Sequence, residues 1–197
     1  SDLSKPTRDR QRAELDRPLK ALATIDRSTL GPDAQLYFDL FQRQFEQAKE
    51  GTRFPDELLP LNQMGGVQQD IAQTLSIMPA GKVSDFADMI ARLEASGKLV
   101  DQTLDLLREG LAKGITPPRI TLRDVPQQVL NNLPTDPKDS AVFRPFREMP
   151  TAIPDTDKEA LRVRALAAIT NVFYPKFREL HRFLADEYVP KARESIA

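Results

Sequence analysis

Apolar residues recur along most of the chain at steps of three and four positions, and glycine or proline separates one run from the next. This period places the apolar side chains of each run on one face of an α-helix, whereas alternation typical of a β-strand is confined to the short stretch 119–122. We therefore predict an all-α fold, an elongated helical array with long ordered loops. Residues 1–197 are expected to form a single helical domain, long enough to bury a core.

The N-terminal quarter of the chain predicts two helices. The first covers residues 7–25, and Pro18 should kink or divide it, because proline lacks the N–H group that an interior helical position donates. The second covers residues 32–51, with Gly51 as its C-terminal cap. Three aromatic residues share one face of the second helix, and we interpret them as helical core rather than a ligand cage: Tyr37, Phe41 and Phe45.

The middle of the chain alternates between a loop and helices. Residues 52–67 contain two prolines and a Gly-Gly pair, which exclude a long regular element, but they are too apolar for a solvated linker. We predict an ordered loop packed on the core. A helix over 68–77 follows, and then helices over 84–96 and 98–113, which Gly97 separates and which should form an antiparallel pair.

The C-terminal part is rich in proline and ends in the longest helical pattern. Eight of the 16 prolines lie between Pro117 and Pro154, where one helix fits over 122–133. Residues 134–154 are predicted to be a long, irregular, Pro-rich loop. The last helix should cover residues 155–195 and bend at Pro175. Two aromatic residues should anchor the loop to the core: Phe143 and Phe146.

Charge and composition exclude several classes of protein. The chain has 28 Lys and Arg against 29 Asp and Glu, a net charge of -1, which argues against a dedicated nucleic-acid binder. No apolar run approaches the ~20 residues of a membrane span, and the polar start is unlike a signal peptide. Cysteine is absent, which excludes disulfides and thiolate metal ligands without selecting a compartment.

The sequence contains few residues in the patterns that catalytic sites use. A zinc peptidase helix needs two histidines one turn apart with a glutamate between them, and the chain has one histidine, His181. We therefore predict no catalytic residue and no metal ligand here, and we interpret His181 as a packing or surface residue. A hydrolase that uses His181 in a Ser-His-acid triad stays open, although no G-x-S-x-G motif supports it. Two carboxylate pairs are interpreted as solvated helix surface: Asp85 with Asp88, and Asp101 with Asp105.

Three polar residues stand out as candidates for a site. Asn62 and Gln63 lie in an otherwise apolar loop, and buried amides need hydrogen-bond partners. Arg119 follows Pro117-Pro118, which should hold it rigidly. Each of the three is either a structural clamp that satisfies loop carbonyls or a contact to a substrate or partner outside this chain.

Four segments together resemble a known family. They are LYFDLFQRQFEQAKEG (36–51), RFPDELLPLNQMGG (53–66), LVDQTLDLLREGLAKGITPPR (99–119) and YPKFRELHRFLADEYVPKAR (174–193). This series resembles the N-terminal part of bacterial domain-of-unknown-function family 885, and the likeness runs over roughly 15–195. Its most specific parts are the loop Asn62–Gly65, the turn Gly114–Arg119 and the ending Glu187–Pro190.

The resemblance implies a helical, cleft-type zinc metallopeptidase that is much longer than this chain and is often exported or lipid-anchored. Its zinc motif, similar to H-E-x-x-P-G-H-H, would lie downstream. The chain is then expected to be the N-terminal fragment, a cleft wall or lid that binds no cofactor and is inactive alone, with zinc required by the full-length protein. The implied partners are a missing C-terminal catalytic half and a peptide substrate, and the implied location is periplasmic or at a lipid-anchored envelope.

An alternative function is a self-contained helical protein-binding module associated with the envelope. The long terminal helix and the apolar loops would then recognise a partner. If the chain is a fragment, we expect an exposed apolar patch larger than the ~300–600 Å² of ordinary monomers, and self-association through it.

Overall fold

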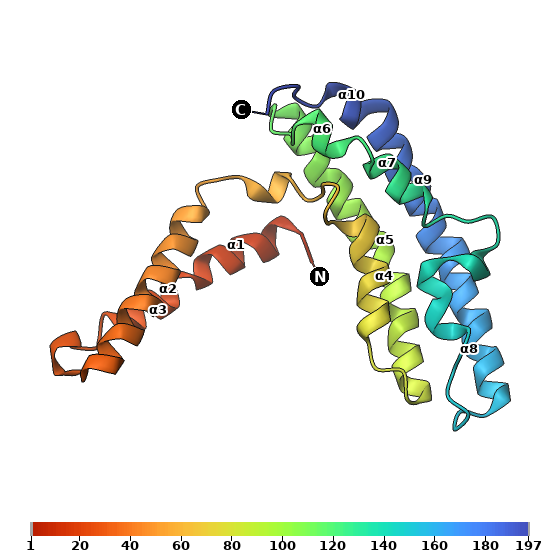
Figure 1. Ribbon diagram of the computed structural model, residues 1–197, viewed down its shortest axis with the longest axis horizontal. Helices are drawn as coiled ribbons and strands as arrows, with labels where there is room; N and C mark the ends of the chain where they lie inside the picture. Colours follow the sequence, from red (N-terminus) through yellow and green to blue (C-terminus); the bar gives the residue numbers. More distant parts are fainter. Residues whose placement is uncertain (1, 197) are drawn as a thin grey trace. The chain divides into compact units, whose positions relative to one another are not determined.

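The computed structural model describes residues 2–196, and most of these residues are helical (Figure 1). The all-α prediction is confirmed: the described part of the chain contains no β-strand, only an isolated bridge between Asn62 and Gly65. The α-helices, in chain order, are α1 (Lys5–Glu14), α2 (Asp16–Leu22), α3 (Pro32–Gly51), α4 (Val67–Ile77), α5 (Val83–Ala112), α6 (Arg119–Leu122), α7 (Val125–Leu130), α8 (Asp155–Ala168), α9 (Tyr174–Phe183) and α10 (Val189–Lys191). Shorter helical segments are η1 (Arg27–Thr29), η2 (Asp56–Leu58), η3 (Pro137–Asp139), η4 (Ala141–Phe146), η5 (Ile169–Phe173) and η6 (Leu184–Tyr188).

Contacts group the chain into two compact units, residues 1–56 and residues 57–197. We call them the N-terminal unit and the C-terminal unit and describe each by itself. A domain is defined by cooperative folding as well as by contacts, so the single domain over residues 1–197 stays a prediction.

The N-terminal unit is a helical hairpin preceded by α1. The predicted helix over 7–25 is divided, as expected, but at Leu15 rather than at Pro18. Pro18 then occupies the first turn of α2, where a helix does not need the missing N–H group. Two ion pairs hold the hairpin antiparallel: Asp16 to Lys49 at 2.7 Å, and Arg27 to Asp39 at 2.6 Å.

Helix α3 has the predicted bounds but not the predicted packing. Its aromatic face is exposed: 71% of Tyr37 and 43% of Phe41 are accessible, and no residue of α3 is buried. The interpretation of this face as core is therefore wrong, because the seven-residue α2 covers only one strip of the 20-residue α3. Gly51 is not a left-handed cap either, since positive φ angles occur at Gly66 and Gly114 within the described residues.

The C-terminal unit is built around α5, which packs against α4 and against the helical run from α8 to α10 (Figure 1). The predicted pair of helices over 84–96 and 98–113 is wrong, because α5 continues through Gly97 without a break. A Cβ atom on Gly97 would lie 2.9 Å from Cγ1 of Val172. Gly97 therefore marks a close approach between α5 and η5, not the end of a helix.

The predicted long C-terminal helix is present and runs without a break from Asp155 to Lys191. It passes through Pro175 and Pro190 by local widening: a π-helical segment, η5 or η6, lies directly before each proline-containing helix. Proline removes one hydrogen bond and crowds the carbonyl of the preceding turn, and a π-turn relieves that crowding.

The segments between these helices are ordered and partly buried. Residues 122–133, predicted as one helix, form the end of α6 and the separate helix α7, with Pro126 in the first turn of α7. Residues 134–154 contain η3 and η4, and both Phe143 and Phe146 are buried. Within the loop predicted over 52–67, Leu58 and Leu61 are buried and Met64 is exposed. None of the helices described here combines the length and apolarity that crossing a membrane requires.

Candidate functional site

The turn from Asn62 to Gly65 is closed by its own hydrogen bonds. The N–H of Asn62 donates to the carbonyl of Gly65 at 3.0 Å, and the N–H of Met64 donates to Oδ1 of Asn62 at 2.8 Å. The Asn62 side chain therefore satisfies the main chain of the turn. That contact is the clamp alternative stated for Asn62.

Gln63 is held through its main chain. Its N–H donates to the carbonyl of Thr121 at 3.2 Å, and its carbonyl accepts from Nε2 of Gln69 at 3.1 Å and from Nε2 of Gln128 at 3.0 Å. The residue itself is exposed. The backbone of Gln63 is thus fixed to three helices, α4, α6 and α7, while its side chain lies at the surface.

Gln68, in the first turn of α4, is the main hydrogen-bond donor to this loop, and no sequence pattern indicated it. It is buried, and its Nε2 donates to the carbonyl of Asn62 at 2.9 Å and to the carbonyl of Gly65 at 3.2 Å. Its Oε1 has no hydrogen-bond partner among the described residues. Gly66 adopts φ +127°, and a Cβ atom there would lie 2.5 Å from Cβ of Leu61. The turn therefore needs glycine at position 66.

Asn132 extends the amide contacts away from the loop. Its Nδ2 donates to the carbonyls of Gln68 and Gln128, both at 2.9 Å. Its own carbonyl accepts from Oγ of Ser140 at 3.2 Å. The loop, α4, α7 and the start of η4 are therefore joined by side-chain amides and one hydroxyl.

Arg119 lies at the C-terminal end of the long helix. Its Nη2 donates to the carbonyl of Pro190 at 3.0 Å, its N–H donates to the carbonyl of Arg193 at 2.7 Å, and its Nη1 lies 3.1 Å from Oε1 of Glu194. Arg193 in turn contacts Thr116: its N–H donates to Oγ1 of Thr116 and its Nε donates to the carbonyl of Thr116, each at 3.0 Å. A cation at the carbonyl end of a helix is favourable, so Arg119 clamps the 114–119 turn to the last helical turn.

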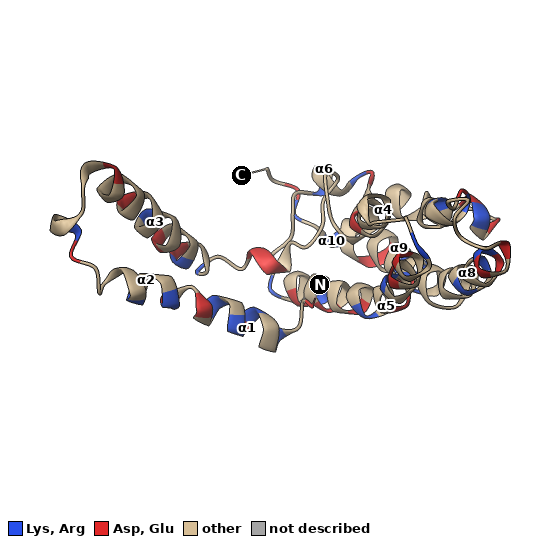
Figure 2. Cartoon of the chain, turned by 90° about the horizontal axis from the view of Figure 1, so that it is seen from below, with Lys and Arg blue, Asp and Glu red and all other residues tan. Residues whose placement is uncertain are grey.

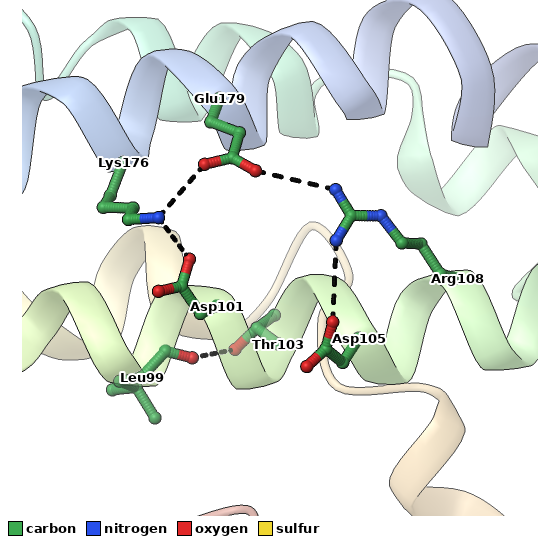
Figure 3. Close-up of polar contacts among 7 residues, drawn as sticks. All are labelled: Leu99, Asp101, Thr103, Asp105, Arg108, Lys176 and Glu179. Atoms are coloured by element: carbon green, nitrogen blue, oxygen red, sulfur yellow. Dashed lines mark hydrogen bonds and ion pairs between the residues drawn. The ribbon is translucent and has the colours of Figure 1, made fainter.

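Four ion pairs form a series on the facing sides of α5 and α9, and two of them, Lys176 to Asp101 and Arg108 to Glu179, cross between the helices (Figure 3). Lys176 lies 2.5 Å from Asp101 and 3.2 Å from Glu179, and Arg108 lies 3.6 Å from both Glu179 and Asp105. The pKa of Lys176 is raised, chiefly because its ammonium group donates a hydrogen bond to Asp101. Desolvation acts in the opposite direction, and the hydrogen bond to Glu179 adds to the rise. Asp101 and Asp105, predicted as solvated helix surface, thus belong to a line of alternating charges on the surface between two helices.

His181 is partly buried in α9. Residues 2–196 contain no group of three or more His, Cys, Asp or Glu side chains that could hold a metal ion. The absence of a metal ligand from this chain stays a prediction.

The chain belongs to the bacterial protein family of unknown function DUF885, whose model matches residues 1–196. That match confirms the family resemblance; the assignment to the N-terminal part and the zinc peptidase activity stay predictions. No curated protein matches the chain.

Among solved structures, the chain is similar to the crystal structure of "the putative lipoprotein from Colwellia psychrerythraea". The TM-score is 0.63 at 19% sequence identity, and the likeness covers 68% of this chain and 24% of that one. The two proteins therefore share a fold in the matched region. The matched part of this chain spans about a quarter of the Colwellia protein.

Proposed function

We propose that the chain is the N-terminal helical part of a larger zinc-dependent peptidase, where it forms a wall or lid of the substrate cleft, and that it is inactive alone. One observation carries this proposal: the family match covers residues 1–196, yet the chain's likeness to the Colwellia protein covers 24% of that protein. A protein as long as the Colwellia protein has room for catalytic residues outside the region matched here.

The residues of this chain do not fit a zinc site. The sequence has one histidine, and a peptidase zinc helix uses two with an intervening glutamate. The described residues also lack any cluster of three suitable side chains. In the proposal, zinc is therefore bound by residues elsewhere in the longer protein and activates the water that attacks the peptide.

The contribution of this chain is to position the substrate. Gln63 is the residue we propose to contact peptide, because its main chain is fixed by three hydrogen bonds while its amide side chain lies at the surface. The side-chain amide of Gln63, carried on this fixed main chain, can donate to and accept from an extended peptide backbone. Asn62 and Arg119 act as clamps that keep the loop and the end of the long helix in place.

The test has a genetic and an enzymatic step. Sequencing the reading frame beyond codon 197 should find continued coding sequence with a zinc motif, and a stop codon there would defeat the proposal. With the longer protein in hand, a fluorogenic peptide library should be hydrolysed in the presence of zinc, whereas the 197-residue chain should show no turnover. Gln63→Ala in the longer protein should raise KM more than it lowers kcat, while Gln44→Ala on exposed α3 should leave both unchanged.

Envelope association belongs to the same proposal. The name of the Colwellia protein is compatible with it, and cell fractionation with an antibody to the longer protein tests it directly. Recovery in the cytoplasmic fraction would contradict it.

A second candidate function is a self-contained binding module, and the exposed aromatic face of α3 favours it. A partner captured through this face should be lost in Tyr37→Ala and retained in Val163→Ala, a change at an exposed residue of α8. Phe177 and Leu184 are unsuitable as probes of a binding surface, because both are fully buried and their loss would disturb folding.

A further inference from the structure

The N-terminal unit exposes an apolar face that its own residues do not cover. Within its described residues, Leu22 is the buried hydrophobic side chain. The face, which we call the α3 stripe, lies at helical spacing along one helix: Leu36, Tyr37, Leu40, Phe41 and Phe45. Large side chains of this kind carry about 150–250 Å² each, so the exposed part amounts to roughly 400 Å². This area lies within the ~300–600 Å² of the largest apolar patch on ordinary monomers, a patch that is often functional.

The stripe leads into an open groove of about 510 Å³. Phe45 lines the groove together with three apolar residues at the break between α1 and α2: Leu15, Pro18 and Ala21. Phe41 and Phe45 contact each other with ring centroids 4.6 Å apart, so the exposed stripe and the groove are one continuous surface. A groove with an apolar floor, next to an apolar helix face, has the form that accepts the apolar side of another helix.

Helices α1 and α2 beside the groove carry a net positive charge, although the two charged residues that line the groove itself, Glu14 and Arg17, have opposite signs. The segment from Lys5 to Leu22 carries six Lys and Arg against three Asp and Glu (Figure 2). Gln11, Glu14 and Arg17 line this side of the groove. A helix lying along it is therefore favoured if its flank next to α1 and α2 is acidic.

We propose that the α3 stripe and this groove are the docking surface for an amphipathic helix from the part of the longer protein that lies outside this chain, with an apolar inner face and an acidic flank. The inference rests on the proposed function for the existence of that longer protein, and the length of the Colwellia relative supports it. A 20-residue helix with no buried residue gains little from packing within its own unit. Most helical stability in proteins comes from packing an apolar face, so a covering segment stabilises α3.

Hydrogen exchange of the amides of α3, measured in the 197-residue chain and in the longer protein, tests the proposal. We expect α3 to exchange about tenfold more slowly, or slower still, in the longer protein, while the amides of α5 change little, since α5 already packs within its own unit. Equal exchange of α3 in the two proteins would overturn the proposal. So would protection of α3 that appears in the short chain with increasing concentration and alongside a dimer in sedimentation, because the occupant would then be a second copy.

A pair of substitutions locates the contact. Leu40→Asp in the longer protein should abolish the protection of α3, whereas Val163→Asp, at an apolar residue of α8 that is exposed to a similar extent, should leave it intact. Both side chains are exposed in the chain itself, so neither change should unfold it. If α3 is protected but no peptide is hydrolysed, the docking surface stands and the peptidase proposal fails. If peptide is hydrolysed while α3 exchanges freely, the reverse holds.

Discussion

Helices α3 and α5 have the same kind of sequence pattern and opposite environments. Both carry apolar residues at steps of three and four. In α5, residues are buried along the whole length, from Phe86 to Gly110, whereas α3 has none. Periodicity thus specifies that a segment forms an amphipathic helix, but the neighbours decide whether its apolar face is covered.

The neighbours differ in length. Helix α5 is packed against α4 and against the long run from α8 to α10, whereas α3 has the seven-residue α2 beside it within its unit. The same residue type should therefore behave differently in the two units. Phenylalanine, glycine, tyrosine and lysine each occur in both environments, and each pair provides a test.

The largest difference is expected for phenylalanine. Phe86 is fully buried on α5, with its ring centroid 5.7 Å from that of Phe146, so Phe86→Ala should lower the free energy of unfolding by about 3–5 kcal/mol. Phe41→Ala removes a ring that is 43% exposed and should cost about 1 kcal/mol or less. Urea unfolding followed by circular dichroism measures both. Equal losses in the two variants would show that the two faces are equally covered in solution.

Glycine should give effects of opposite sign. Gly97→Ala places a methyl group 2.9 Å from Cγ1 of Val172, and overpacking of this kind costs about 1–3 kcal/mol, because a β-branched side chain cannot rotate away easily. Gly51→Ala meets no atom within 4 Å and has no positive φ, so it should stabilise α3 by up to about 0.5–1 kcal/mol. The same unfolding assay reports the sign. A stabilising Gly97→Ala would mean that α5 and η5 are not in close contact.

Much of the fold could be predicted from the sequence, because helical periodicity and proline are local signals. The bounds of α3 and the long C-terminal helix follow from such signals. Gly97 shows their limit, since glycine both ends helices and permits close contact within them, and the difference depends on Val172, a residue distant in sequence.

The residues of the candidate site could likewise be predicted only in part. Asn62 and Arg119 stood out because an amide in an apolar loop and an arginine after two prolines are unusual locally. Gln68 and Gln128, which hold the main chain of the loop, did not stand out, since a glutamine near a helix start is ordinary. Their role depends on a turn and a helix that are adjacent only in the folded chain.

Tyrosine should give a smaller, pH-dependent difference. The hydroxyl of Tyr188 is buried and has no hydrogen-bond partner among residues 2–196, so Tyr188→Phe should be neutral or stabilising by about 1 kcal/mol at pH 7. Burial also raises the pKa of Tyr188 to about 12 from an ordinary 10.0. The folded state then holds its proton more tightly than the unfolded state. The contribution of this difference in proton binding to the free energy of unfolding is therefore fully present below pH 10 and is lost as the pH rises from 10 towards 12.

Stability measured at alkaline pH tests the prediction for Tyr188. Unfolding measured between pH 9 and about pH 12 should show a smaller loss of stability in Tyr188→Phe than in the unsubstituted chain. Tyr37→Phe should change the free energy of unfolding little at pH 7, because Tyr37 is 71% exposed. If Tyr188→Phe lost stability at pH 7, its hydroxyl would have a partner in solution.

Lysine should give the smallest difference. Lys176 lies in the line of ion pairs between α5 and α9, and Lys49 pairs with Asp16 at 2.7 Å between α2 and α3. Solvent screens both pairs, so Lys176→Met and Lys49→Met should each cost about 1 kcal/mol or less. Because the pKa of Lys176 is raised above its ordinary 10.5, the contribution of Lys176 to stability should persist up to that pH and disappear above it.

Lys176 has two carboxylate partners, so the loss of stability in Lys176→Met should be larger than in Lys49→Met and should shrink more between 0.05 and about 1 M salt. Losses of equal size and equal salt dependence would mean that the two ion pairs of Lys176 act no more strongly together than the isolated pair of Lys49 with Asp16 does.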